Sequence, residues 1–500
     1  MPAAKLLVIG LDSADKDLMI EWARDGSLPH FARLLENGRY GEMVAPPGQC
    51  AGTAWVSINT GCSPARHGCY FDSQLQPGTY NYAKFLPQNQ QARPFWERLS
   101  KAGKRVAIVD VPKAPASENF NGLQILDWGN HDPEYDYARS CPPSLVQEIE
   151  ARFGKDPVGS CDLLARAGSG PADLAALRDR LVERIKTKVR IVQYIRAKGS
   201  WDLVMAVFAD SHCAGHQFWR VRDPNHPGYD ADLARALGDP LKDVYVALDT
   251  AVGELIANMD SNTGLIAFSD LGIGPNYSAT FLLRDIVRKL HANARNRRSP
   301  HVDALRWLWR KLPRSARIRG RSILSPVKRD IDLETKDRDY FTIRSNDDCG
   351  AIRINLEGRE PAGRVRAGRE YDELCEAISR DLREIVNLET GEPLVKEVLR
   401  TDDLFEGPRL ADLPDLNIVW NQKAPVRRVH SRKIGVIERR HEGPRSGDHR
   451  SRGFCLMQGP GMGNERLPPM SAMDLAPTIC SWLGVEFEAD GSPSLTASRH

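Results

Sequence analysis

The sequence predicts an α/β protein with a doubly wound, mainly parallel sheet flanked by helices and a smaller inserted α+β portion. Three observations support this fold class. Short apolar runs of about four to eight residues end at Gly, Asp or Ser, which is typical of buried strands in a parallel sheet. Stretches with helical periodicity separate these runs, and strands that alternate with helices usually form parallel sheets. The alternation is interrupted once, between residues 284 and 334.

The first strand is expected at residues 5–11, directly before the apolar–polar pattern of a helical region at 17–38 that ends at Gly38. Two longer helical patterns follow in the middle of the chain, at 172–197 and 243–258. The remaining strands are identified by the same kind of short apolar run, and they are expected at 105–111, 202–208, 264–270 and 415–420.

The length of the chain indicates more than one structural unit, since 500 residues exceed the ~250–300 at which a single hydrophobic core stops growing. We assign 1–283 to the first part of the α/β core and 284–334 to a basic amphipathic insertion. Residues 335–410 first alternate as strands do and then become amphipathic, which predicts a smaller α+β portion. Residues 411–500 are expected to return to the core.

The composition is that of an ordinary soluble globular chain, with 41% hydrophobic residues and a formal net charge of +3. The ten cysteines are dispersed without a CxxC pair, which excludes a zinc ribbon and a thioredoxin-type pair and suits a reducing compartment. No stretch approaches the ~20 apolar residues of a membrane-spanning helix, and the first apolar run is too short for a signal peptide. We therefore expect a cytoplasmic protein.

Residues of metal-ligand type stand near the ends of the apolar runs. Asp12 follows the first strand, Asp270 follows the strand at 264–270, and His212 and His216 follow the strand at 202–208. His449 lies just before the apolar run GFCLM. Sites in open α/β sheets form beyond the carboxyl ends of the strands, so these five residues are expected to converge there.

Each of these residues also has an ordinary structural interpretation. A strand-end aspartate is often a helix N-cap, a pair of histidines is often hydrogen-bonded within the core, and His449 lies in a basic stretch that a solvated loop would explain. The spacing of His212 and His216, four residues apart, places both imidazoles on one face of a helical turn. An Asp/His set suits zinc, and His212, His216 and His449 would form a three-histidine site for one zinc ion and an activated water.

Five ordered segments carry a family resemblance. They are VIGLDSAD, AWVSINTGCSPARHG, FSDLGIGP, GDHRSRGFCLMQGPG and MDLAPTICSWLGV. In this order they resemble the signatures of the alkaline phosphatase superfamily, and the most similar branch is the type I phosphodiesterase/nucleotide pyrophosphatase group, in a divergent bacterial form. The resemblance covers residues 5–285 and 335–492. The sequence contains no GxxxxGK[ST], GxGxxG, HExxH or GxSxG motif that would indicate another class.

The resemblance implies an alkaline phosphatase-like core that holds one or two divalent ions, usually zinc, and hydrolyses phosphate esters, preferentially diesters. By position, Asp12 and Asp270 match metal-site aspartates and His449 matches the late histidine ligand. His216 matches the histidine of an Asp-x-x-x-His motif in which His212 replaces the aspartate. The anionic substrate would be attracted by the Arg-rich stretch 426–450.

Two positions depart from the family pattern. Leu271 follows Asp270 where the family has a histidine, so the second metal site would keep only two carboxylates, which favour a weaker, harder ion or none. Ala51 occupies the usual position of the nucleophile, flanked by Cys50 and Thr53. We take Thr53 as the candidate nucleophile, because coordination to a metal activates a hydroxyl.

These departures keep two alternatives open: a degenerate member that binds a metal and an anion with little or no turnover, and a sulfatase-like ester hydrolase. Between Arg284 and Arg329, the basic stretch 284–330 has fifteen Lys/Arg against two acidic residues. It is expected to be either a solvated helix pair or a docking surface for anionic lipid or an acidic partner. The sequence does not determine the oligomeric state.

Overall fold

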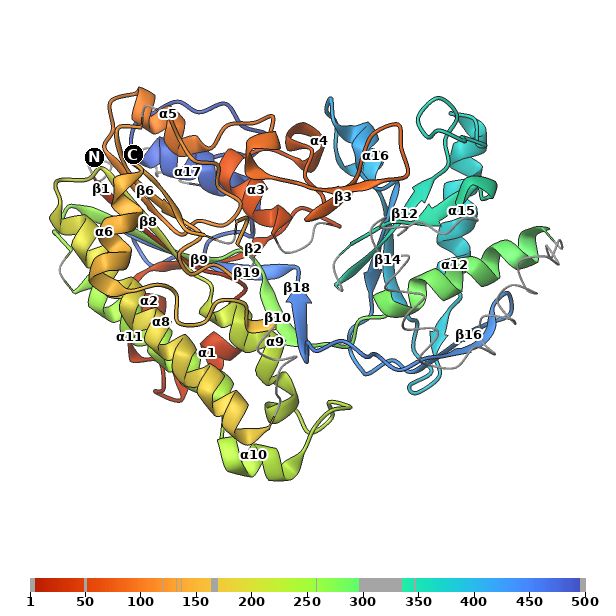
Figure 1. The fold of residues 1–500 in the computed structure, drawn as a ribbon, viewed down its shortest axis with the longest axis horizontal. Coiled ribbons are helices and arrows are strands. Elements are labelled where there is room, and N and C mark those ends of the chain that lie inside the picture. The colour runs from red at the N-terminus through yellow and green to blue at the C-terminus, as the bar shows by residue number, and fades with distance from the viewer. Residues whose placement is uncertain are drawn as a thin grey trace.

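The computed structural model describes residues 5–48, 52–118, 120–131, 133–135, 137–162, 170–257, 259–295, 335–345 and 348–494. The larger of two units is built on a nine-stranded sheet in the order β20-β2-β19-β9-β1-β8-β5-β6-β7 (Figure 1). The central strands β9, β1, β8, β5 and β6 run parallel, whereas β19 and β7 are antiparallel to their neighbours in the series. The predicted fold class is confirmed.

The strands of this sheet are short and apolar, as the sequence indicated. Their bounds are Lys5–Leu11 for β1, Arg39–Val44 for β2, Val106–Val109 for β5, Gly122–Leu126 for β6, Arg139–Cys141 for β7, Leu203–Phe208 for β8, Thr263–Ser269 for β9, Arg452–Gln458 for β19 and Met470–Ser471 for β20. Two antiparallel strand pairs lie outside the sheet: β3 (Ser73–Leu75) with β4 (Tyr82–Lys84), and β10 (Gly272–Pro275) with β18 (Gly447–Arg450).

Helices cover both faces of the sheet, because successive side chains of a strand point to opposite faces. In β1, Leu7 and Ile9 pack against the helices of one face, and Leu6 and Val8 pack against those of the other. The first group comprises α1 (Lys16–Arg24), α2 (Pro29–Asn37), α6 (Ser144–Phe153), α8 (Pro171–Ala197), α9 (Asp210–Arg222), α10 (Ala231–Leu237) and α11 (Pro240–Ile256). The second comprises α3 (Thr53–Thr60), α5 (Phe95–Lys101) and α17 (Leu475–Trp482), and the short α4 (Pro64–His67) follows α3.

The smaller unit lies beside the main one and has its own hydrophobic core (Figure 1). It combines a four-stranded sheet in the order β11-β12-β15-β14 with a three-stranded sheet in the order β13-β16-β17. Its elements are α12 (Thr280–Arg295), β11 (Tyr340–Thr342), β12 (Cys349–Ile354), α15 (Arg369–Arg383), β13 (Val386–Asn387), β14 (Val395–Arg400), α16 (Thr401–Leu404), β15 (Leu416–Trp420), β16 (Arg428–Ser431) and β17 (Gly435–Glu438).

The strand expected at 415–420 exists but belongs to this smaller unit. It pairs antiparallel with β12 and β14, and the chain re-enters the main sheet only at β19. The expectation of a return to the main sheet near residue 415 is therefore corrected. Its apolar side chains pack with those of α12 in the core of the smaller unit, and an apolar composition does not specify which sheet a strand joins. The domain boundaries at 283, 334 and 410 stay predictions.

The structure describes only the first part of the basic stretch 284–330. Residues 280–295 form α12, whose apolar side from Leu282 to Leu290 packs into the smaller unit. The rest of the expected docking surface, from 296 to 330, lies outside the described residues. Among the residues that are described, no helix is long and apolar enough to cross a membrane.

Candidate metal centre

Four secondary-structure elements bring the predicted site residues together. Asp12 and Asp270 directly follow β1 and β9, which are neighbours in the sheet. His212 and His216 lie on α9, which begins two residues after β8, the other neighbour of β1. His449 lies on β18, opposite Ile273 of β10. All these elements meet at the carboxyl ends of the parallel strands, where open α/β sheets form their sites.

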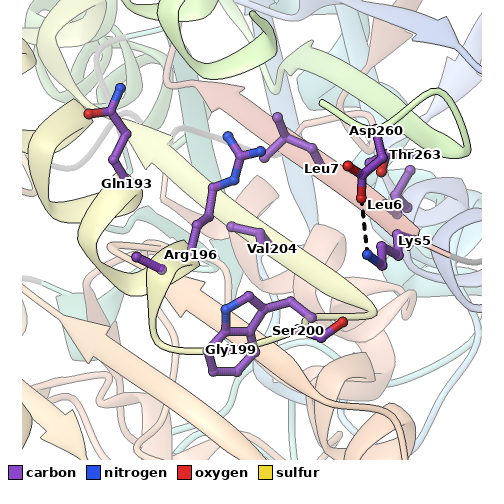
Figure 2. A pocket seen from close by; sticks show the side chains of 12 residues that line it. Lys5, Leu6, Leu7, Gln193, Arg196, Gly199, Ser200, Val204, Asp260 and Thr263 are labelled. Atoms are coloured by element: carbon purple, nitrogen blue, oxygen red, sulfur yellow. Dashed lines mark hydrogen bonds and ion pairs between the residues drawn. The ribbon is translucent and has the colours of Figure 1, made fainter. Parts of the chain in front are cut away.

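A cavity of about 510 Å³ lies at the opposite end of these strands. Figure 2 shows Lys5, at the start of β1, paired with Asp260, and both residues line this cavity. Nζ of Lys5 lies 3.1 Å from Oδ2 of Asp260. None of the predicted site residues lines the cavity. The convergence of the aspartates and histidines, not the size of a cavity, therefore locates the candidate site.

Asp12 is buried and fully engaged. Its Oδ2 accepts a hydrogen bond from Nδ1 of His212 at 2.8 Å, and its Oδ1 accepts hydrogen bonds from Nε1 of Trp55 at 3.1 Å and Oγ of Ser13 at 3.3 Å. Burial by itself would raise the pKa of Asp12, but the charge and hydrogen bond of His212 hold this pKa below its ordinary value. Asp12 is therefore an anion that fixes the ring of His212.

Asp270 differs from Asp12 in its hydrogen bonding and in the direction of its pKa shift. Its Oδ1 accepts a hydrogen bond from the backbone N–H of Ser13 at 2.9 Å, while its Oδ2 has no hydrogen-bond partner among the described residues. Burial and the negative charge of Asp12 raise the pKa of Asp270 to about 8. The neighbouring Leu271 is fully buried. A cation beside the two carboxylates would lower this pKa and ionise Asp270.

The two histidines of α9 face one another through the same ring atom. Nε2 of His212 lies 3.0 Å from Nε2 of His216. Nδ1 of His212 faces a carboxylate and Nδ1 of His216 faces the carbonyl oxygen of Gly447 at 2.8 Å, and both of these oxygens can only accept. Each Nδ1 therefore carries hydrogen, and whenever both rings are neutral the lone pairs of the two Nε2 atoms point at each other.

His449 completes a cluster of three imidazoles. Its ring is edge-on to both other rings, with centroid distances of 4.6 Å to His212 and 4.9 Å to His216. Its Nδ1 is buried without a hydrogen-bond partner among the described residues. Burial and nearby positive charges hold the pKa of His216 and of His449 well below the ordinary value, so both rings are neutral, as metal ligands must be.

Two further residues of the cluster were not found from the sequence. Asp448 and His449 bring ligand atoms within 4.8 Å of those of His216, and His131 does the same with His212 and His216. The ring of His131 stacks on that of His212 at 3.9 Å. Asp448 stands next to His449 in GDHR, and His131 follows the apolar run GLQIL of β6, a signal of the same kind as those that were used.

Thr53 is buried at the first position of α3. The same helix carries Trp55, which donates to Asp12, and Ala54, which packs with Ala45 and Leu271. The residue that the sequence suggested as nucleophile therefore lies on an element that contacts both strand-end segments of the site. The first turn of a helix also favours negative charge, as on a phosphate group.

The chain is similar to known proteins in its family pattern and in its fold. The family model for type I phosphodiesterase / nucleotide pyrophosphatase matches residues 6–428. Phosphonoacetate hydrolase from Sinorhizobium meliloti 1021, solved with phosphonoformate, has a similar structure, with a TM-score of 0.53 at 14% identity over 96% of each chain. No curated protein matches the sequence.

A second similar structure is murine ectonucleotide pyrophosphatase / phosphodiesterase 5, with a TM-score of 0.50 at 14% identity over 98% of this chain and 97% of that one. The structure of an inactive threonine-to-alanine variant of that enzyme, in complex with AMP, matches this chain with the same TM-score, identity and coverage. The identities are too low to carry more than the fold, and the family is shown by the match over most of the chain. The protein therefore belongs to the type I phosphodiesterase/nucleotide pyrophosphatase family, hydrolases that act on phosphoric ester bonds.

Proposed function

We propose that the protein is a metal-dependent phosphodiesterase whose principal ion, zinc, is held by His212, His216 and His449. The observation that carries this proposal is the 3.0 Å approach of the two Nε2 atoms of His212 and His216. Two facing lone pairs repel unless a proton or a metal ion lies between them. The imidazole of His449, whose Nδ1 has no hydrogen-bond partner within the described part of the chain, and the nearby carboxylate of Asp448 favour the metal ion.

The spacing supports zinc in particular. With Zn–N bonds of about 2.0–2.1 Å and a tetrahedral angle, two ligand nitrogens lie ~3.3 Å apart, so the observed pair needs to open by only a few tenths of an ångström. Three nitrogen ligands are the number used by catalytic zinc sites, which leave a fourth position for the substrate. Zinc bound there would supply a Lewis acid for a phosphoryl oxygen.

In this proposal Asp12 positions a ligand instead of serving as one. Its hydrogen bond to Nδ1 of His212 matches the carboxylate–histidine–metal arrangement, which fixes the tautomer of the ligand and makes it more basic. The sequence-based prediction of Asp12 and Asp270 as ligands of a second ion is retained as a weaker proposal. It is supported by Oδ2 of Asp270, which has no hydrogen-bond partner among the described residues, and limited because Leu271 supplies no imidazole.

Thr53 is proposed as the nucleophile that attacks phosphorus, aided by its place at the N-terminus of α3. We expect Thr53→Ala to lower kcat by about 10²-fold or more, because removing the attacking hydroxyl raises the barrier by ~3 kcal/mol. Thr53→Ser should keep the activity within about tenfold of the unmodified protein, since the hydroxyl remains. Steady-state kinetics on a chromogenic diester measures both. Equal rates for the alanine and serine variants would remove Thr53 from the reaction.

A basic cleft beside the histidine cluster supports an anionic diester as substrate. The cleft has a volume of about 660 Å³, which is large enough for the leaving group of a diester. It adjoins the site directly, because Gln217 and Ser446 line it and the backbone of Ser446 donates to the carbonyl of His216 at 2.7 Å. The basic side chains that line it are Arg220, His226, Arg427, Arg440, His441 and Arg445.

Reversing one charge of the cleft should weaken substrate binding. We expect Arg440→Glu, at an exposed position, to raise KM for an anionic diester about three- to tenfold while kcat stays nearly constant, because the side chain attracts the substrate without contacting the reacting atoms. Arg369→Glu on α15, whose side chain is 91% exposed and lies outside the cleft, is the matched control. A fall in kcat with unchanged KM would contradict this role.

The degenerate member remains a second candidate function, because Leu271 packs with Ala45 and Ala54 where the family has a metal-binding histidine. Metal content and turnover decide between the two candidates. The purified protein should contain zinc and hydrolyse a chromogenic phosphodiester faster than the matching monoester and sulfate ester. Zinc without turnover on any of the three would support the degenerate member, and preference for the sulfate ester would support a sulfatase.

The nine described cysteines are free thiols, which supports a cytoplasmic location.

Restoring the missing ligand is expected to restore the second site. Leu271→His should add about one equivalent of zinc per chain, because an imidazole then joins the unpaired carboxylate oxygen of Asp270. Leu271→Met, which changes the packing without adding a ligand, should add none. Elemental analysis of the two variants provides the comparison. Identical zinc content in both would show that Asp12 and Asp270 do not form a metal site.

A further inference from the structure

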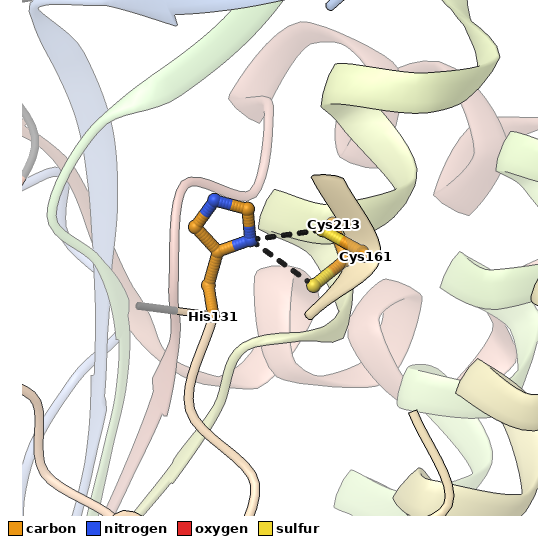
Figure 3. Close-up of side chains that lie close together, drawn as sticks. All are labelled: His131, Cys161 and Cys213. Atoms are coloured by element: carbon orange, nitrogen blue, oxygen red, sulfur yellow. Dashed lines mark hydrogen bonds between the residues drawn. The ribbon is translucent and has the colours of Figure 1, made fainter. Parts of the chain in front are cut away.

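Figure 3 shows a second cluster of metal-ligand residues, His131, Cys161 and Cys213, which the proposed reaction does not use. Nδ1 of His131 lies 3.2 Å from Sγ of Cys161 and 3.2 Å from Sγ of Cys213. All three side chains are buried. We call these residues the thiol–histidine cluster.

The cluster is assembled from three separate parts of the chain. His131 lies in the loop after β6, Cys161 precedes α8, and Cys213 lies on α9 between the two histidines of the metal centre. The loop that carries His131 is fixed near its start. The carboxylate of Asp110 accepts hydrogen bonds from the backbone N–H groups of residues 128 and 129, at 2.8 and 2.9 Å.

We propose that the thiol–histidine cluster binds a second zinc ion, through Nδ1 of His131 and the thiolates of Cys161 and Cys213. Two thiolates and one imidazole are a ligand set that zinc uses in proteins, and soft thiolates select zinc over harder divalent ions. Binding breaks two S–H bonds and forms two Zn–S bonds, so two protons are released to solvent.

The spacing of the donors is close to that of an occupied site. Zn–S bonds of about 2.3 Å and a Zn–N bond of about 2.0–2.1 Å place nitrogen and sulfur ~3.5 Å apart in a tetrahedral site. The observed separations of 3.2 Å require each sulfur of Cys161 and Cys213 to move outward by a few tenths of an ångström. Side-chain rotation provides such a shift without a change in the backbone.

The surrounding charges suit a neutral zinc dithiolate. Arg184 donates a hydrogen bond from Nη2 to Sγ of Cys213 at 3.3 Å, which stabilises negative charge on the sulfur. Its own positive charge is balanced by Asp210, whose carboxylate lies 2.7 Å from Nε of Arg184. The ion brings two positive charges and the thiolates two negative ones, so the buried region remains near neutrality.

Zinc at Nδ1 requires the hydrogen of the His131 ring to be on Nε2. Nη2 of Arg445 lies 3.3 Å from this atom but makes shorter contacts with Asp162, whose Oδ2 is 2.6 Å from Nη2 and 3.0 Å from Nε. The contact of Arg445 with the carboxylate is retained when its weaker contact with the ring is lost. The bound form therefore needs one tautomer change and no rearrangement of the ion pair.

This site does not depend on the proposed function, because none of its three ligands is among the three histidines that hold the principal ion. The two sites are nevertheless close, since the ring of His131 stacks on that of His212. The chain would then hold two zinc ions, the principal one at His212, His216 and His449 and the second at the thiol–histidine cluster.

Cobalt substitution of the full chain tests the proposal without reference to activity. Cobalt bound to thiolates gives a near-ultraviolet charge-transfer band that imidazole ligands do not produce. We expect this band in the unmodified protein and in His216→Ala, and its loss in Cys161→Ser and Cys213→Ser. Cys375→Ser, at a fully buried thiol of α15, is the matched control and should keep the band. Zinc content should fall by about one equivalent in each variant of the cluster.

A less disruptive variant tests the site with a lower risk of misfolding. His131→Gln keeps both thiols and should weaken zinc binding by about 10- to 100-fold, measured by competition with a chelator. The proposal is overturned if the unmodified protein shows no charge-transfer band, or if the band persists when both cysteines are replaced. It is also overturned if intact mass and thiol titration show a disulfide between Cys161 and Cys213 in the protein purified without oxidant. Loss of activity in His216→Ala with the band intact would separate the two sites.

Discussion

Replacing His216 by alanine is expected to remove the principal ion and to lower kcat/KM on a phosphodiester by about 10³-fold, or ~4 kcal/mol. The imidazole is fully buried and supplies one of the two facing Nε2 atoms. The backbone carbonyl of Gly447 orients the His216 ring, but it is not an imidazole and cannot take over the role of His216 as a metal ligand. Elemental analysis and steady-state kinetics on the same preparation measure the two losses.

The control for this variant is His430→Ala, a histidine on β16 of the smaller unit, outside the metal centre. It should keep both zinc and activity. The thermal unfolding temperature of each variant, measured without added metal, separates loss of a ligand from loss of the fold. An alanine variant at position 216 that keeps its full zinc content and its activity would show that the three-histidine site is not the catalytic centre.

Replacing Lys188 by methionine is expected to destabilise the protein by about 3–5 kcal/mol, the usual cost of leaving one partner of a buried ion pair without the other. Nζ of Lys188 lies 2.8 Å from the carboxylate of Asp110, and both side chains are fully buried. The same ammonium group donates hydrogen bonds to the carbonyls of Gly129 at 3.2 Å and Val207 at 3.0 Å. A methionine side chain fills the volume but cannot donate a hydrogen bond, so all three acceptors lose the ammonium group and the buried charge of Asp110 loses its counter-ion.

Urea unfolding followed by circular dichroism measures this change in the free energy of unfolding. Lys186→Met, two residues away on the exposed side of α8, should change it by less than ~0.5 kcal/mol. Lys188 also holds the segment that leads to His131, so the variant should bind metal more weakly under conditions where it remains folded. Equal free energies of unfolding for the two variants would show that water or a conformational change stabilises the carboxylate of Asp110 in place of Lys188.

Much of the fold follows from local patterns in the sequence. The apolar runs at 5–11, 202–208 and 264–270 are β1, β8 and β9 within one residue of the expected limits at each end. Their side chains are buried on both faces, and such strands have a continuous apolar composition that can be recognised without knowing their partners. The strand at 415–420 was found for the same reason but assigned to the wrong sheet, because composition does not specify which neighbour a strand pairs with.

The convergence of Asp12, His212, His216, Asp270 and His449 was also inferred from the sequence, since each stands near the end of an apolar run and parallel strands end at one edge. Their roles as ligands stay predictions. The chemistry of each residue was decided by contacts between distant segments. Residues 12 and 212 are joined by the hydrogen bond that makes Asp12 an orienting group, and no local pattern encodes such a contact.

The sequence by itself therefore determined the fold class, the family and the positions from which a site is built, because these depend on periodicity and on motifs that are read along the chain. Only the tertiary structure decided that Asp448 and His131 lie beside the histidines, that burial and the charge of Asp12 raise the pKa of Asp270, and that Cys161 and Cys213 meet at one imidazole. These properties arise from burial and from the approach of side chains far apart in the chain. The physical reason is that hydrogen bonds, pKa values and ligand sets depend on distances in space, which residue spacing along the sequence does not specify.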